Sequence, residues 1–182
     1  MVTIHCLGSG LVGSFVIKKL STLGVKINVI DIEETNYLIE NDLIKIYVKD
    51  AFLYCQETFD DDDLFINMLP GNLGHSVTKL LVSKGKRIVD LSFSEETPEI
   101  LHEIALESGA RLLWDVGIAP GFSNMLISYA SRVGDGIINA EIRVGGNPIE
   151  TDAEWSYMAP FSPNDVIAEY TRPARIVRDR KI

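Results

Sequence analysis

Gly8-Ser9-Gly10-Leu11-Val12-Gly13 (GSGLVG) is the stretch that decides the fold of this chain. An apolar run, Val2 to Leu7, precedes it, and Val16, Leu20 and Leu23 recur at helical spacing after it. An apolar run, a glycine turn and an amphipathic helix are the successive parts of a βαβ unit that binds a dinucleotide. The sequence therefore predicts a strand, a phosphate-binding loop and a helix at the start of the chain.

The three glycines of this loop have separate predicted roles. Gly8 makes the tight turn, Gly10 lets a pyrophosphate approach the backbone, and Gly13 lets the helix pack closely on the strand. The helix N-terminus then presents free N–H groups to the phosphates. The remaining loop residues complete the predicted cofactor-binding loop: Ser9, Leu11 and Val12.

An acidic residue follows the second predicted strand, Lys26 to Ile30. Gly24 ends the preceding helix, and Asp31 stands about 20 residues after the glycines. A carboxylate at this place accepts hydrogen bonds from the adenosine ribose hydroxyls and repels a 2′-phosphate. Residues 32–36 contain no Arg or Lys that would pair with such a phosphate. The sequence therefore predicts NAD as the cofactor, the alternative being a chance glycine turn in another α/β protein.

Composition and charge limit the class of protein. The 182 residues are 46% hydrophobic and 24% charged, which is ordinary for a globular protein of one domain or slightly more. The net charge of −9 argues against nucleic acid as a partner, because phosphate backbones are bound by clustered Lys and Arg. We interpret the acidic run Asp60 to Asp63 as solvated surface, and we predict no metal site.

The cysteines and the hydropathy indicate a cytoplasmic protein. Cys6 and Cys55 lie in apolar surroundings without CxxC spacing, so we expect both to be buried, reduced and unreactive. No apolar stretch approaches the ~20 residues of a membrane span, and no basic region precedes the first apolar run. We therefore expect neither membrane insertion nor secretion.

Short apolar runs continue to alternate with helical segments. Further strands are predicted at 43–48, 64–69, 87–91 and 111–116, and helices at about 75–84 and 98–108. Thr97 is the predicted N-cap of the second of these helices, and Gly109 is its predicted C-cap. This alternation is typical of an α/β protein with a doubly wound parallel sheet of Rossmann type, covered on both faces. We assign residues 1–118 to an NAD-binding Rossmann domain.

The pattern changes after residue 117. A helix is predicted from Ala119 to about Arg132, and the other expected elements are a strand at 137–144, a possible strand at 155–161, a short helix at 162–170 and an extended segment at 174–177. Residues 119–182 are therefore expected to form an α+β domain for substrate binding and dimerisation. With no closing helix in view, we expect this domain to be incomplete and to need more chain or a partner.

Ligands of such a sheet bind outside the carboxyl ends of the strands. Asp50 follows the third predicted strand and can reach an adenine amino group, although a solvated acid explains it equally well. Asn67 ends the fourth strand, just before a tight turn of Leu69, Pro70 and Gly71. That turn brings backbone groups close to the cofactor ribose, and its glycine avoids a clash. The alternative is a plain turn without a ligand.

Two carboxylates are the candidate catalytic groups. Asp90 and Asp115 each end a central strand. Either can hold a substrate ammonium group or accept a proton during hydride transfer. The alternative is that they cap the following loops by accepting backbone N–H groups.

A substrate carboxylate has two predicted binding elements. The helix that begins at Pro120-Gly121 offers its N-terminus, and Asn124 lies in its first turn. Arginine forks suit a carboxylate as well, and Arg172, before Pro173, is preferred over Arg143 and Arg175. The alternative for each arginine is a structural ion pair.

Four segments resemble the saccharopine dehydrogenase and lysine dehydrogenase family. They are Leu69-Pro70-Gly71-Asn72-Leu73-Gly74, Val89-Asp90-Leu91-Ser92-Phe93, Asp115-Val116-Gly117-Ile118-Ala119-Pro120-Gly121-Phe122-Ser123-Asn124 and Glu169-Tyr170-Thr171-Arg172-Pro173-Ala174-Arg175. The resemblance implies an N-terminal Rossmann domain followed by an α+β domain that binds an amino acid and commonly dimerises. It also implies hydride transfer between a nicotinamide cofactor and the C–N bond of an amino acid such as lysine or saccharopine.

Chain length is the departure from that family, whose members are roughly twice as long. The resemblance therefore implies a homodimer, or a second chain that completes the substrate domain. Two other interpretations stay open. One is a non-catalytic NAD-binding regulatory module, like the cytoplasmic domains of potassium transport systems. The other is a truncated relative that keeps the fold without turnover.

Overall fold

The computed structural model describes residues 2–145, 150, 154, 163–173, 176–179 and 181. The chain forms two compact units, Met1–Arg143 and Val144–Ile182. The functional boundary expected at residue 118 stays a prediction. No helix among the described residues is long and apolar enough to cross a membrane.

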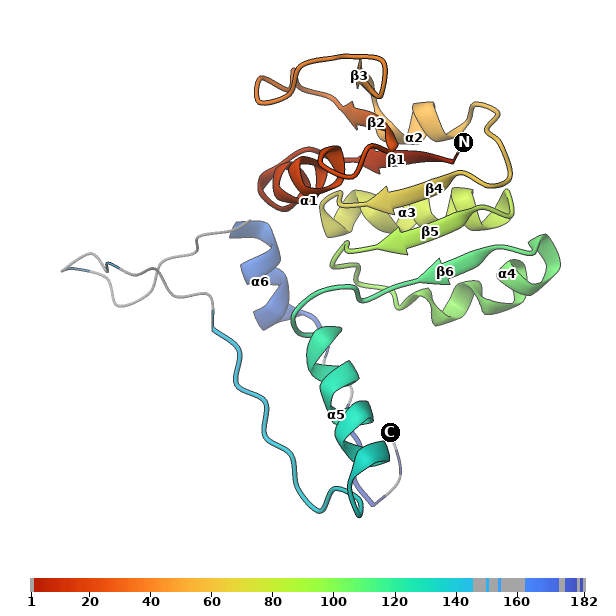
Figure 1. Cartoon of the computed structure of the whole chain (residues 1–182). Helices are drawn as coiled ribbons and strands as arrows, with labels where there is room; N and C mark the ends of the chain where they lie inside the picture. The colour runs from red at the N-terminus through yellow and green to blue at the C-terminus, as the bar shows by residue number, and fades with distance from the viewer. Residues whose placement is uncertain are drawn as a thin grey trace. The chain divides into compact units, whose positions relative to one another are not determined.

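The first unit is built on six parallel strands in the order β3-β2-β1-β4-β5-β6 (Figure 1). The strands are β1 Thr3–Leu7, β2 Lys26–Asp31, β3 Ile44–Val48, β4 Leu64–Asn67, β5 Arg87–Asp90 and β6 Arg111–Leu113. Every boundary lies within three residues of its predicted position. The order reverses between β1 and β4, which confirms a doubly wound sheet with its switch point beside β1.

Helices connect most of these strands. In the first unit they are α1 Leu11–Ser21, α2 Ala51–Cys55, α3 Gly71–Ser83, the 3₁₀ turn η1 Pro98–Leu101 with α4 His102–Ser108, and α5 Phe122–Val133. The second unit contains α6 Pro163–Thr171, which confirms the predicted short helix. Gly109 ends α4 with φ +75°, as predicted. Thr97 is the N-cap residue of η1, as predicted, although its side chain makes no capping hydrogen bond.

The two faces of the sheet are covered by different numbers of helices (Figure 1). On one face, Ile17 of α1 packs with Cys6 and Val29, whereas α2, α3 and α4 all pack on the other face around Phe65. Residues 32–43, between β2 and β3, contain no helix that would join α1. Leu113 of β6, at the opposite edge of the sheet, is 57% exposed, so the expectation that both faces are covered fails there.

Two further expectations on apolar segments need correction. Leu23 is exposed and does not belong to the buried face of α1, which Val16, Ile17 and Leu20 form. Residues 137–144 form no strand, because an isolated strand has no ladder partner and none lies beside it among the described residues. The strand predicted at 155–161 lies outside the described residues, and the segment predicted at 174–177 lies partly outside them.

The cysteines agree with their predicted environment. Cys6 and Cys55 are buried and are not joined in a disulfide. Burial raises the pKa of each thiol to about 12, because the apolar surroundings disfavour the thiolate. Neither cysteine is therefore a nucleophile at neutral pH.

A histidine lies inside the core at the amino ends of the strands. The ring of His5 stacks on Phe65 with 4.5 Å between centroids, and its Nδ1 lies 2.8 Å from the Tyr54 hydroxyl. Its Nε2 lies 3.3 Å from Asp63 Oδ2, and the other oxygen of Asp63 accepts the Thr3 N–H. Asp63 is only 6% exposed, so the expectation of a fully solvated run from Asp60 to Asp63 is wrong at its last residue.

The buried His5 makes stability depend on pH. Desolvation lowers the pKa of His5 below its usual value, and Asp63 offsets this only in part. The folded chain therefore binds a proton at His5 less readily than the unfolded chain does. The contribution of neutral His5 to the stability of the fold is complete above about pH 6.5, the pKa of a histidine in the unfolded chain. It is lost as the pH falls below that value.

We predict that His5→Phe reduces the acid sensitivity of the fold. Urea unfolding of the wild type and the variant at about pH 7.5 and about pH 5.5 measures it. Between these pH values, the free energy of unfolding should fall by up to about 1.4 kcal/mol per pH unit more in the wild type than in the variant. This is the largest pH dependence that one proton allows. Equal losses in both proteins would contradict a buried, neutral His5.

Candidate functional site

The glycine loop between β1 and α1 has the geometry expected of a phosphate loop. Gly8 has φ +91°, which favours glycine, so it makes the tight turn. A β-carbon on Gly13 would lie 2.3 Å from the carbonyl oxygen of Gly8, so only glycine allows the helix to lie this close to the strand. A β-carbon on Gly10 would meet nothing within 4 Å. The three predicted roles thus correspond to a turn with positive φ, a close contact and an open surface.

The first turn of α1 presents donors without acceptors. The hydrogen bonding of the helix begins with the Ser14 N–H, which donates to the Gly10 carbonyl. Among the described residues, the N–H groups of Leu11, Val12 and Gly13 have no acceptor. These donors and the positive end of the helix dipole favour an anion.

Asp31 lies against this loop. Its Oδ2 accepts the Ser9 N–H at 2.6 Å and the Ser9 hydroxyl at 2.7 Å, and its Oδ1 accepts the Glu33 N–H at 3.2 Å. Partial burial raises the pKa of Asp31, but the hydrogen bonds from Ser9 and from the backbone of Glu33 and Ile32 outweigh it, so the pKa lies below its usual value. The side chain is therefore a carboxylate at neutral pH.

These features fit a dinucleotide. The open surface at Gly10 leaves space for a diphosphate, and the unpaired N–H groups of Leu11, Val12 and Gly13 would donate to it. Asp31 would then receive the ribose hydroxyls at the end of β2. Asp50 caps α2, where its Oδ1 accepts the Leu53 N–H at 2.9 Å, and its contact with adenine stays a prediction.

The predicted cofactor contact of Asn67 needs correction. Asn67 is fully buried, and its amide donates to the Gly74 carbonyl and the Thr78 hydroxyl and accepts the Leu69 N–H. Asn67 follows Phe65 by two residues on β4, so its side chain faces α3 rather than a ligand. Its role is to fix the start of α3 against the sheet.

The turn of Leu69, Pro70 and Gly71 is the start of α3, with Pro70 at the N-cap. This helix therefore begins earlier than predicted. A β-carbon on Gly71 would lie 1.7 Å from the Phe93 carbonyl oxygen, so the glycine avoids a clash within the protein rather than with a ribose.

For Asp90 the structure supports the loop-capping alternative. Asp90 is 2% exposed, and its Oδ1 accepts the Ser92 N–H at 2.8 Å and the Ser92 hydroxyl at 2.6 Å. Its Oδ2 accepts the Thr78 hydroxyl at 2.5 Å. The carboxylate thus holds β5 to α3, and these bonds occupy it within the protein.

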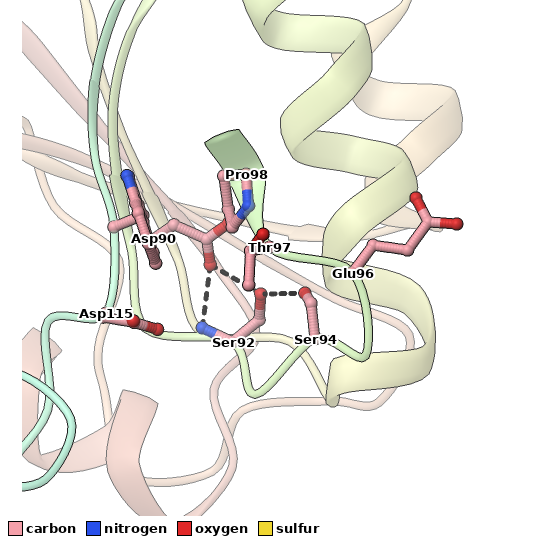
Figure 2. A pocket seen from close by; sticks show the side chains of 8 residues that line it. Asp90, Ser92, Ser94, Glu96, Thr97, Pro98 and Asp115 are labelled. Carbon is pink, nitrogen blue, oxygen red and sulfur yellow. Dashed lines mark hydrogen bonds between the residues drawn. The ribbon is translucent and has the colours of Figure 1, made fainter. Parts of the chain in front are cut away.

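A small polar pocket lies at the carboxyl ends of β5 and β6 (Figure 2). Asp115 lines it with φ +54°, a conformation that non-glycine residues rarely adopt. Figure 2 shows the hydrogen bonds of Ser92 with Asp90 and Ser94, and it shows Glu96 pointing away from Asp90 and Asp115. The lining residues are Asp90, Ser92, Ser94, Glu96, Thr97, Pro98, Trp114 and Asp115. Among the described side chains, no group of three metal-ligating residues occurs here or elsewhere.

The first turn of α5 is already occupied. The Gly121 N–H donates to Asn124 Oδ1 at 3.0 Å, the Phe122 N–H to the Gly117 carbonyl at 2.9 Å, and the Ser123 N–H to the Ile118 carbonyl at 3.0 Å. The predicted binding of a substrate carboxylate at Gly121 and Asn124 is therefore not supported. Asn124 caps the helix instead.

The candidate arginines have different positions. Arg143 is exposed and pairs with Glu141, with 2.7 Å between the Arg143 guanidinium and Glu141 Oε1. Arg172 follows α6 in the second unit, and its contact with a substrate carboxylate stays a prediction. Arg175 lies outside the described residues.

No family model matches the chain. Three crystal structures of S. aureus homoserine dehydrogenase, at pH 6.0, 6.5 and 7.5, share 17% sequence identity with it. The TM-scores are 0.42, 0.43 and 0.44, with 62% of this chain covered in the first comparison and 72% in the other two. The matches span only 32 to 40% of those chains, and a likeness this weak carries no conclusion about function.

We predict that substitution by alanine has very different effects on stability at two glycines of the loop. Gly13→Ala should destabilise the fold by about 1–3 kcal/mol, because the added carbon meets backbone that cannot move without separating α1 from β1. Gly10→Ala, where the space is open, should change stability by less than about 0.5 kcal/mol. Urea unfolding of both variants measures the difference. Equal destabilisation would contradict the described packing of α1 on β1.

Proposed function

We propose that this chain binds NAD(H) at the loop between β1 and α1. The observation that carries the proposal is the set of N–H groups at Leu11, Val12 and Gly13, which have no acceptor among the described residues and follow directly after the open space at Gly10. A diphosphate satisfies such donors. The position at the switch point of a doubly wound sheet supports the same ligand.

The charge of Asp31 supports NAD over NADP. Its lowered pKa keeps the carboxylate ionised, and no Arg or Lys follows it within residues 32–36. A 2′-phosphate next to this carboxylate would repel it without a cation to compensate. The ribose hydroxyl of NAD instead donates to it.

We predict at least about tenfold tighter binding of NADH than of NADPH, which corresponds to about 1.4 kcal/mol. Fluorescence titration of both nucleotides measures the preference. Asp31→Asn should reduce the preference, because it removes the negative charge. Asp50→Asn is the matched control, since Asp50 also lies near the carboxyl end of a strand but caps a helix, and it should leave the preference unchanged.

Gly10→Val should abolish the binding of both nucleotides while the far-UV circular dichroism stays unchanged, because its side chain would fill the open surface. Equal affinities for NADH and NADPH would contradict the assignment of NAD. An unchanged affinity in Gly10→Val would contradict the loop as the binding site.

We propose further that the chain is an oxidoreductase module that acts on the C–N bond of an amino acid. The four segments that resemble saccharopine and lysine dehydrogenases support this activity. The bound nicotinamide would supply the hydride acceptor. Asp115, in the polar pocket, would hold the substrate ammonium group and accept its proton, whereas Asp90 would only support the pocket.

We predict that Asp115→Asn lowers NADH formation with L-lysine or saccharopine by about tenfold or more, because a positioned acid–base group contributes at least that much. NADH affinity should change less than about twofold, since Asp115 lies outside the glycine loop. Wild-type turnover in Asp115→Asn would contradict the role of Asp115.

A non-catalytic NAD-binding module is the second candidate function. The occupied first turn of α5 and the internal hydrogen bonds of Asp90 favour it, because both remove groups that a substrate would use. NADH binding without NADH formation from either amino acid would support this candidate and contradict the dehydrogenase.

A further inference from the structure

The Ser9 side chain occupies the acceptor that the ribose is expected to use. The Ser9 hydroxyl donates to Asp31 Oδ2 at 2.7 Å, and the Ser9 N–H donates to the same oxygen at 2.6 Å. A second hydroxyl supports this arrangement, because Thr35 Oγ1 lies 3.2 Å from Ser9 Oγ. The single proton of Ser9 is given to Asp31, so Thr35 is the donor in that contact.

These bonds leave Asp31 with little capacity for a ligand. Each carboxylate oxygen has two lone-pair positions. The two donors from Ser9 fill both positions of Oδ2, and the Glu33 N–H takes one position of Oδ1. The backbone N–H of Ile32 also interacts with this carboxylate, so at most one position remains, whereas an adenosine ribose offers two hydroxyl donors.

We propose that the Ser9 hydroxyl is an intramolecular competitor of the ribose for Asp31, and that it limits the nucleotide to one hydrogen bond with this carboxylate. The proposal rests on the proposed nucleotide site. Ser9 thereby lowers the affinity of the loop for an intact ribose and weakens its discrimination between ribose and deoxyribose.

The hydroxyl is not needed to orient the carboxylate. The Ser9 N–H holds Oδ2 and the Glu33 N–H holds Oδ1, and both are backbone groups that a side-chain substitution leaves in place. Removal of the hydroxyl therefore frees a lone pair of Oδ2 without releasing Asp31. The freed lone pair belongs to a charged and partly buried carboxylate. A hydrogen bond to such a group contributes more binding free energy than a hydrogen bond between neutral groups does.

Calorimetric titration with ADP and 2′-deoxy-ADP tests the proposal. The wild type should bind the two nucleotides within about twofold of each other, because it accepts only one ribose hydroxyl. Ser9→Ala should bind ADP at least about threefold more tightly than the wild type does. Its affinity for 2′-deoxy-ADP, which has a single ribose hydroxyl, should stay within about twofold of the wild-type value.

Two further variants separate competition from a change in the fold. Ser14→Ala is the matched control, because the Ser14 hydroxyl donates to the Leu11 carbonyl on the same helix and does not contact Asp31; it should leave both affinities unchanged. Thr35→Val removes the donor that holds the Ser9 hydroxyl and should strengthen ADP binding in the same direction as Ser9→Ala, by a smaller factor.

The outcomes distinguish this proposal from the one on which it rests. Tighter ADP binding by Ser9→Ala, without a gain for 2′-deoxy-ADP, supports the competition. Unchanged or weaker ADP binding, or an equal change for both nucleotides, overturns the competition and leaves the nucleotide site standing. A wild type that binds neither nucleotide overturns both. Should Ser9→Ala not fold, weaker or unchanged ADP binding by Thr35→Val overturns the competition.

Discussion

The approach of α1 to β1 is the constraint on which the candidate site depends. The Gly13 backbone lies so near the Gly8 carbonyl that no β-carbon fits between them. The chain between these glycines is thereby confined to a tight loop, in which Gly8 takes a left-handed conformation. The loop leaves the first N–H groups of α1 without an acceptor among the described residues and brings Ser9 within hydrogen-bond distance of Asp31. The donors and the carboxylate of the site thus follow from one backbone contact.

The positions of the six strands and the glycine loop could be predicted from sequence because both depend on local patterns. Short apolar runs are typical of strands that are buried in a parallel sheet. The spacing of Gly8, Gly10 and Gly13 indicates where the backbone must turn tightly, stay accessible and pack closely. By contrast, residues 137–144 have a strand-like composition but no neighbouring strand among the described residues. Pairing is a property of the whole sheet, and a single segment does not encode it.

The role of Asn67 and the bond of Asp90 to α3 were missed because a place at the end of a strand does not say which way a side chain points. Successive side chains of a strand point to opposite faces of the sheet, and this alternation contains the information that was missed. Asn67 shares a face with Phe65, and Asp90 shares a face with Ile88, and both apolar residues belong to the core under α3. Thr78 of α3 then bonds to both polar side chains. No sequence motif identifies the Thr78 hydroxyl, because its hydrogen bonds to Asn67 and Asp90 form only when α3 packs on β4 and β5.

The helix starts of α1 and α5 show why a glycine before a helix does not by itself predict an anion site. Gly10 and Gly121 occupy the same N-cap position. The loop before α5 curls back, so the carbonyls of Gly117 and Ile118 and the side chain of Asn124 satisfy its first N–H groups. The chain enters α1 directly from β1, and no carbonyl of the described residues accepts from Leu11, Val12 or Gly13. The path by which the chain enters a helix therefore decides whether the first turn is available to a ligand.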